Sequence, residues 1–407
     1  MSISSLASRV ESYVDELCVK TPGRQVGSPG NRRATEFFRH QVASFGFQTE
    51  CPEFECIDWE HGDVTLQVGG ARFEAFVSPY SLPCDVIAPL VCASTIEELE
   101  DAHITGNIAV LRSELAREQL MPKNFPFYNP DDHQKIIGLL EQGEPAAIIS
   151  ATSRNPAMAG GLYPFPMFED GDFDIPSVYL TEEEGHRLAS HVGEDVLLKF
   201  ESSRIPSRGC NVIARKGAAQ SARVVFCAHI DAKKGTPGAL DNAAGVAVLL
   251  ALAHILKDYS GRLGLEIVAL NGEDYYAVPG QLLYVSSNAG KLGEVLLGVN
   301  IDGAGYRDGR TAYSLCGCTD EIARAVQRNF GREYGFVEGE PWVQGDHMLF
   351  VMGQRPAVAI TSERAADLLT SVIHTERDRP ELLDYGKLAR IAEGLGSLFL
   401  DIGSSLS

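Results

Sequence analysis

Histidine and acidic residues follow several short apolar runs in the second half of the chain. Imidazole and carboxylate groups are protein ligands for divalent metal ions, and a carboxylate that is not a ligand can act as a general base. Side chains of this kind at the ends of apolar segments indicate a site for metal-assisted chemistry rather than a core. The residues are His229 in VVFCAHID, Asp241 in GALDNAAG, Glu273 and Asp274 in LNGEDYY, Asp302 in GVNIDGAG, and His374 in VIHTERD.

Each of these residues alone has an ordinary structural explanation. A histidine after a strand is often a core or surface residue, Asp241 could cap the following helix, and Asp302 could be a turn residue. Several carboxylates at one sheet edge, however, would repel one another unless cations neutralise them. Two imidazoles with carboxylates and no thiolate suit zinc, or alternatively cobalt or manganese. Two such ions, roughly 3.5–4 Å apart, would need one bridging carboxylate.

The apolar runs predict the elements that bring these residues together. The segment 224–230 is continuously apolar, as expected for a strand buried on both faces of a parallel sheet, and a helix is expected from Asp241 to Tyr259. Ligands of open α/β sheets bind beyond the carboxyl ends of the strands. The pattern therefore predicts an α/β fold whose mixed, mostly parallel central sheet carries helices on both faces. Further strands are expected at 265–270, 295–301 and 357–360, and a terminal helix at 382–398.

A chain of 407 residues is too long for most single cores, so two domains are expected. Residues 1–52 contain two amphipathic helices, the second starting after Asn31 as its N-cap. Residues 53–206 show short alternating runs separated by turns, which are typical of a mostly β domain with a helix or two. The sequence thus predicts a discontinuous catalytic domain, 1–52 and 207–407, interrupted by an inserted domain.

Composition limits the partners and the compartment. A formal charge of −20 argues against nucleic acid and anionic membranes as partners, and it could attract substrates with a free ammonium group. No apolar stretch is long enough to cross a bilayer, and the first residues lack the pattern of a signal peptide, so a cytoplasmic location is expected. The 9 cysteines are then expected to be reduced thiols, and Cys316 and Cys318 are interpreted as small strand residues.

The quoted motifs resemble, in the same order, those of the co-catalytic zinc aminopeptidase family, which includes bacterial leucine aminopeptidases, aminopeptidase Y and glutamate carboxypeptidase. The resemblance covers most of residues 207–400 through AHID, PGALDNAAGVAVLLALA, NGED, NIDGAG, GDHMLF and HTERDRPELLD. The segment RQVGSPGNRRATEFFRHQVASFGF is similar to the N-terminal helices of this family. Within the insert, TGNIAVLR, GEPAAIIS and DIPSVYLTEEEGHRL are similar to a protease-associated domain.

The resemblance implies a role for each candidate residue. A set of histidine and aspartate ligands would hold two zinc ions, and two further carboxylates would assist them. Asp231 would orient or polarise the first histidine, and Glu273 would be the general base. In the ligand set, His229 and Asp302 would bind one ion, Asp274 and His374 the other, and Asp241 would bridge the two.

Two residues depart from the family pattern. The family usually has Glu–Glu where this chain has Glu273–Asp274, and the shorter Asp274 could bind its metal more weakly. The family often has Tyr before the last histidine ligand, where it helps to stabilise an oxyanion, whereas this chain has Ile373. What replaces that tyrosine, like the side-chain preference for substrates, is not apparent from the sequence.

The sequence therefore predicts a zinc metallopeptidase, namely an aminopeptidase that removes N-terminal residues from short peptides. One alternative is a related reaction at the same metals, as in a carboxypeptidase, an acylamino hydrolase or a glutaminyl cyclase. Another is a catalytically silent binding protein on the same fold. The second alternative is disfavoured because every ligand position and Glu273 hold competent residues. The oligomeric state stays open, so an oligomer is as compatible with the sequence as a monomer.

Overall fold

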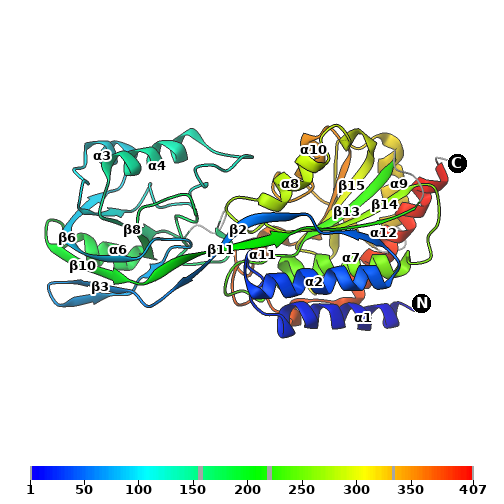
Figure 1. The fold of residues 1–407 in the computed structure, drawn as a ribbon, viewed down its shortest axis with the longest axis horizontal. Coiled ribbons are helices and arrows are strands. Elements are labelled where there is room, and N and C mark those ends of the chain that lie inside the picture. Colours follow the sequence, from blue (N-terminus) through cyan, green and yellow to red (C-terminus); the bar gives the residue numbers. More distant parts are fainter. Residues whose placement is uncertain (1, 155–158, 218–221, 332–334, 406–407) are drawn as a thin grey trace. The chain divides into compact units, whose positions relative to one another are not determined.

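The structure is a computed structural model that describes residues 2–154, 159–217, 222–331 and 335–405. The chain forms two compact units (Figure 1). Unit 1 consists of Met1–Cys56, Arg208–Leu368 and Val372–Ser407, and unit 2 of Ile57–Ser207 with Leu369–Ser371. The sequence placed the insert at 53–206, whereas unit 2 begins at Ile57 and its main segment ends at Ser207.

Unit 1 is built on an eight-stranded mixed sheet. Its middle strands run parallel to one another, and antiparallel strands flank them on both sides. The fold class expected from the sequence is therefore confirmed. In sheet order the strands are β1 (Gln48–Glu50), β12 (Val212–Lys216), β14 (Gly264–Leu270), β13 (Arg223–His229), β15 (Val295–Ile301), β18 (Ala357–Ser362), β16 (Thr311–Cys316) and β17 (Val337–Glu338).

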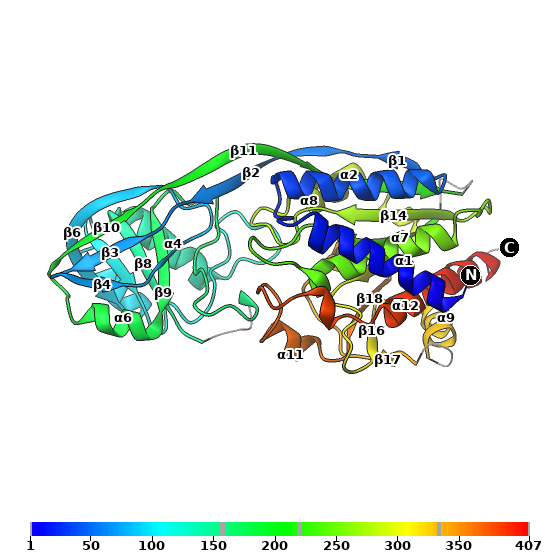
Figure 2. The same cartoon turned by 90° about the horizontal axis from the view of Figure 1, so that it is seen from below.

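Helices cover both faces of this sheet (Figures 1 and 2). On one face lie α1 (Ile3–Asp15), α2 (Pro29–Ser44), α7 (Ala244–Ile255) and α12 (Tyr385–Ser405). On the other lie α8 (Pro279–Ser287) and α10 (Met348–Met352), while α9 (Asp320–Phe330) packs against α12. Helix α7 is buried all around from Ala244 to Ala253, since it packs against β13, α1 and α12. No helix in the described part of the chain has the length and apolar character to span a membrane.

Three helices begin at residues other than those predicted, and one of them is α12, which spans Tyr385–Ser405 instead of 382–398. Helix α2 starts at Pro29, because the Ser28 hydroxyl accepts a hydrogen bond from the Asn31 N–H (2.9 Å) and caps the helix in place of Asn31. Helix α7 starts at Ala244 and ends at Ile255, well inside the expected 241–259. Asp241 and Asn242 have non-helical backbone angles, so Asp241 is not part of the helix.

Unit 2 contains a second eight-stranded sheet, in the order β4 (Ala71–Phe73), β3 (Thr65–Val68), β10 (Asp195–Phe200), β6 (Cys84–Ala93), β7 (Ile108–Leu111), β8 (Ala147–Thr152), β9 (Ser177–Thr181) and β5 (Phe76–Val77). The strands from β6 to β9 are parallel. The described helices are α3 (Ile96–Asp101), α4 (Asp131–Gly143) and α6 (Glu182–Ala189). The chain enters and leaves this unit through β2 (Glu53–His61) and β11 (Ser202–Cys210), which pair with each other.

The packing of α10 against the sheet can be tested at Gly298 in β15. A methyl group there would lie 2.2–2.7 Å from atoms of the Phe350 ring, so Gly298→Ala forces the ring or the strand to move. Such overpacking should lower the free energy of unfolding by about 1–3 kcal/mol, measured by urea denaturation. Gly293→Ala is the matched control, because nothing lies within 4 Å of the added methyl group. Equal stabilities of the two variants would contradict the described packing.

Candidate metal centre

The Asp241 carboxylate lies between two histidine–aspartate pairs. Its Oδ1 atom is 2.9 Å from His229 Nε2, which is also 3.6 Å from Asp302 Oδ1. Its Oδ2 atom is 3.2 Å from His374 Nε2, which is also 3.0 Å from Asp274 Oδ1. The two oxygens of one carboxylate thus face two different imidazoles. This is the arrangement expected of a ligand that bridges two metal ions.

The sheet explains why residues far apart in sequence meet here. His229 is the last residue of β13, Asp302 directly follows β15, and Glu273 and Asp274 follow β14. Because β14, β13 and β15 are adjacent and parallel, their carboxyl ends lie at the same edge of the sheet. His374 comes from the loop after α11 (Ala365–Leu369) and adopts a left-handed φ of 64°. All the predicted ligands therefore lie at one edge of unit 1.

Access to the centre is uneven. The His229 and Asp274 side chains are 1% and 3% exposed, whereas those of His374 and Asp302 are 15% and 20% exposed. Each histidine–aspartate pair therefore has one deeply buried and one more accessible member. The centre is therefore most exposed to solvent at Asp302 and His374.

Two of the unsatisfied atoms of the site, His229 Nε2 and Asp274 Oδ2, are atoms that metal ions would bind. Both ring nitrogens of His229 and Asp274 Oδ2 are buried without a hydrogen-bond partner among the described residues. His229 Nε2 is close to Asp241 Oδ1, but the pair lacks hydrogen-bond geometry. A buried polar atom without a partner costs roughly 1–3 kcal/mol. Nitrogen and carboxylate oxygen donors without a thiolate suit zinc, so the residues present fit this group.

The clustered carboxylates of the site also favour added positive charge. Burial disfavours an imidazolium, yet the carboxylates of Asp274 and Asp241 outweigh burial and raise the pKa of His374 to about 10. The pKa of His229 is likewise raised against the effect of burial, by Asp231, Asp241 and Asp302. In the protein without metal, protonated imidazoles would thus balance part of the negative charge. Divalent cations would do so more completely.

The pKa values of the Glu273–Asp274 pair shift upward. Burial is the largest cause of the raised pKa of Glu273, and the charges of Asp274 and Asp302 add to it. Burial also raises the pKa of Asp274, helped by the nearby Asp241 charge. A general base must be ionised to accept a proton. As the candidate base, Glu273 would therefore need cations beside it to hold its charge.

Asp231 contacts the loop that carries Glu273 and Asp274. Its Oδ1 atom accepts a hydrogen bond from the Gly272 N–H (2.7 Å), and its Oδ2 atom accepts one from the Asp274 N–H (3.0 Å). The sequence predicted that Asp231 orients His229, and its Oδ1 atom lies 3.7 Å from His229 Nδ1. In the described geometry its hydrogen bonds fix the 272–274 loop, so Asp231 positions the candidate base and a candidate ligand.

Asn242, rather than Asp241, makes the side-chain hydrogen bonds at the start of α7. The Asn242 side chain accepts a hydrogen bond from the Gly245 N–H (3.0 Å) and donates one to the Ile301 carbonyl (2.8 Å). The capping role considered for Asp241 is therefore wrong. Its carboxylate is left free to face the two histidines.

Sequence reasoning missed two buried polar residues that support the centre. The Arg24 guanidinium donates hydrogen bonds to the carbonyls of Ile230, Pro237 and Gly238, which brace the loop between β13 and Asp241. The Asp378 carboxylate is fully buried and contacts the same loop from its other end. Both residues stand inside the motifs quoted for the family, but only the fold shows which backbone groups they contact.

The GDHMLF motif contributes buried residues close to the centre. The Asp346 carboxylate accepts a hydrogen bond from Gln281 Nε2 (2.9 Å), and burial raises the pKa of Asp346 to about 7. His347 Nε2 lies 2.9 Å from the Trp342 carbonyl oxygen. Cys227 is buried, and its thiol contacts Asn300 Oδ1 (3.7 Å), in keeping with a core role.

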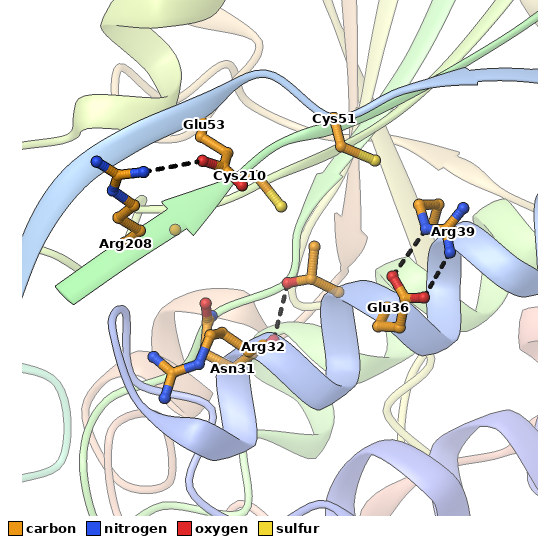
Figure 3. A pocket seen from close by; sticks show the side chains of 10 residues that line it. Asn31, Arg32, Glu36, Arg39, Cys51, Glu53, Arg208 and Cys210 are labelled. Carbon is orange, nitrogen blue, oxygen red and sulfur yellow. Dashed lines mark hydrogen bonds and ion pairs between the residues drawn. The ribbon is translucent and has the colours of Figure 1, made fainter.

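A cavity of about 350 Å³ in unit 1 lies apart from the predicted ligands (Figure 3). Its arginines already have partners, since Arg39 pairs with Glu36 and Arg208 pairs with Glu53. Burial raises the pKa of the Cys210 thiol in its wall to about 11, so that thiol is not activated as a nucleophile. The lining residues are Asn31, Arg32, Thr35, Glu36, Arg39, Cys51, Glu53, Arg208, Gly209 and Cys210.

Comparisons with known proteins agree with the geometry of the candidate metal centre. Residues 211–398 match the model of peptidase family M28. The resemblance to co-catalytic zinc aminopeptidases drawn from the motifs is thereby confirmed. The assignment of unit 2 as a protease-associated-like domain stays a prediction.

The chain is similar to several named aminopeptidases. It is 28% identical over 277 residues to the "probable lipoprotein aminopeptidase LpqL" of Mycobacterium tuberculosis, which covers 65% of this chain and 51% of that protein. It is 23% identical over 312 residues to leucine aminopeptidase 2 of Trichophyton equinum, which covers 72% of this chain and 59% of that protein. The chain thus spans about half to three-fifths of the length of these relatives.

Solved structures share the fold over nearly their whole length. An aminopeptidase from Aneurinibacillus sp. strain AM-1 superposes with a TM-score of 0.75 at 22% identity, covering 96% of this chain and 92% of that one. BSAP, a zinc aminopeptidase from Bacillus subtilis, gives a TM-score of 0.74 at 18% identity, covering 96% and 94%. At this level of identity the likeness establishes the fold.

The raised pKa of His374 predicts how the chelated protein responds to pH. A group whose pKa is higher in the folded state contributes stability below its unfolded pKa, about 6.5 for histidine, and loses it as pH rises through the folded value, here about 10. The free energy of unfolding of chelator-treated protein should therefore fall between these pH values. His374→Gln should show a shallower dependence in urea titrations over the same window. Identical slopes would contradict the described contacts of this imidazole.

Proposed function

We propose that the protein is a metal-dependent exopeptidase, namely an aminopeptidase that removes N-terminal residues from short peptides. The observation that carries this proposal is the Asp241 carboxylate between two histidine–aspartate pairs, with Glu273 in the adjoining loop. That arrangement offers two neighbouring metal positions and a separate carboxylate. These are the parts that hydrolysis by an activated water needs.

In this proposal each side chain has a distinct task. When bound, a pair of zinc ions would supply Lewis acidity, which activates a water and polarises the scissile carbonyl. Glu273 accepts a proton from the attacking water and returns it to the leaving amine. Asp231 keeps Glu273 within reach by fixing the 272–274 loop. The zinc ligands would be His229, Asp241, Asp274, Asp302 and His374, with cobalt or manganese as alternative ions.

The preference for aminopeptidase activity rests on the relatives. The curated relatives described above are named aminopeptidases, and the solved neighbours include a zinc aminopeptidase. A bound peptide's free ammonium group also suits a chain with a formal charge of −20. The same fold occurs in a glutaminyl cyclase from Porphyromonas gingivalis, with a TM-score of 0.53. Cyclisation therefore stays the alternative that an assay should exclude.

Three further assignments belong to the proposal. Unit 2 would be a protease-associated-like domain, on the motifs given above. The location would be cytoplasmic, although one relative is named a lipoprotein. The protein's partners would be short peptides rather than nucleic acid or membranes. The chain could also form an oligomer.

The role of Glu273 can be tested by Glu273→Gln. The amide cannot accept the proton, so kcat on an aminoacyl-anilide should fall by about 10²–10⁴-fold, while zinc content measured by elemental analysis stays that of the parent protein. Glu340→Gln makes the same change at an exposed position and should keep full activity. A fully active Glu273→Gln enzyme would refute the assigned base.

The reaction itself can be tested by comparing peptides with free and blocked ends. A zinc-loaded aminopeptidase should release the first residue from an unblocked peptide, spare its N-acetylated form, and lose activity when a chelator removes the metal. Liquid chromatography with mass spectrometry would identify the products. Release of the C-terminal residue, or loss of ammonia from an N-terminal glutamine, would instead favour a carboxypeptidase or a cyclase.

A further inference from the structure

The turn that carries the bridging aspartate is hydrogen-bonded to Asp378. Asp378 Oδ1 accepts a hydrogen bond from the Leu240 N–H (2.7 Å), and Oδ2 accepts one from the Asp241 N–H (3.0 Å). The Asp378 carbonyl oxygen also accepts from the Ala239 N–H (3.2 Å). One residue thus binds three successive N–H groups of the turn. The Asp378 side chain is fully buried, so no water competes for these contacts.

The turn needs such support because it lies outside the regular helix. Asp241 has φ −121° and ψ 85°, and the preceding Gly238 has a left-handed φ of 58°. The helical ladder of α7 begins only at Ala244. A local bond from the Ala243 N–H to the Gly238 carbonyl (3.0 Å) closes the turn. Asp378 binds the Leu240 and Asp241 N–H groups, so the backbone direction at Asp241 depends in part on tertiary hydrogen bonds. That direction decides whether its two carboxylate oxygens reach both histidines.

Asp378 belongs to the same short segment as the candidate ligand His374. The Asp378 N–H donates to the Thr375 carbonyl oxygen (3.1 Å), and the Thr375 N–H donates to the Val372 carbonyl oxygen (3.1 Å). These bonds stiffen the segment between the two residues. Through Asp378, the segment that presents His374 also holds the turn that presents Asp241. Two candidate ligands are thereby fixed relative to each other.

We propose that Asp378 is a positioning residue that sets the zinc affinity of both metal positions by fixing the backbone of Asp241. The inference rests on the metal centre of the proposed function. Asp231 fixes the 272–274 loop in the same way, with two carboxylate oxygens and two N–H groups. The contribution of Asp378 differs because its turn carries the bridging ligand. Loosening this turn should weaken the binding of both zinc ions together.

The test is Asp378→Asn, starting from the zinc-loaded full chain. The asparagine keeps the volume but places an NH₂ group against one of the two N–H donors, so one hydrogen bond is lost. Zinc affinity, measured by competition with a chromophoric chelator, should fall about 10–100-fold, and both ions should be affected in parallel. Asp384→Asn is the matched control. Asp384 accepts from the Lys387 N–H (3.0 Å) at the start of α12 and should leave zinc affinity unchanged.

A merely structural role would give a different result. In that case Asp378→Asn would lower the Tm of the chelated protein but leave both zinc affinities as in the parent chain, which would overturn the inference. Should the asparagine variant fail to fold, Asp378→Glu keeps two acceptor oxygens, displaced by one methylene, and the same 10–100-fold weakening is expected of it. An Asp378→Glu variant with parental affinity would overturn the inference as well. Zinc affinity is measured without a peptide, so failure of the proposed peptidase activity would be seen separately.

Discussion

Repulsion among buried carboxylates at one edge of the sheet is the constraint on which the rest of unit 1 depends. Two unit charges 4 Å apart repel by about 4 kcal/mol at an effective dielectric constant near 20. Asp241 lies within ion-pair distance of both His229 and His374, whereas Asp302 pairs with His229 and Asp274 pairs with His374. Such a cluster would open unless cations neutralised it and the backbone held it. Metal binding and the stiffness of the surrounding loops are thus two requirements of one site.

The fold meets the second requirement with hydrogen bonds between buried charged side chains and backbone groups. Asp231 holds the loop after β14, Asp378 holds the turn before α7, and Arg24 braces the loop after β13. A carboxylate that accepts two N–H groups fixes both the position and the direction of a loop. Asp274 is one methylene shorter than the glutamate usual in the family, yet its Oδ1 atom lies 3.0 Å from His374 Nε2.

Local sequence patterns predicted the strands and the candidate ligands, which depend on neighbouring residues. They missed helix boundaries and supporting residues that depend on contacts with distant parts of the chain. The continuous apolar run before His229 marked β13, and the residue types at the strand ends marked the candidate site, because burial and ligand chemistry are visible in sequence. The start of α7 was misplaced because Asn242 bonds to the Ile301 carbonyl, a contact across 59 positions. Asp378 was overlooked for the same reason, since its partners lie 137 and 138 positions away.

The pairing of β2 with β11 bears on how the two-unit chain could evolve. Hydrogen bonds join the strands at both ends, from the Asn211 N–H to the Pro52 carbonyl and from the Gly62 N–H to the Glu201 carbonyl. The outgoing and returning chain of unit 2 therefore run side by side, which makes residues 57–207 a module whose two ends are paired. Lineages could enlarge, exchange or shed that module without shifting the register of β13, β14 and β15. The sheet that carries the candidate metal centre and the inserted unit are thus free to diverge at different rates.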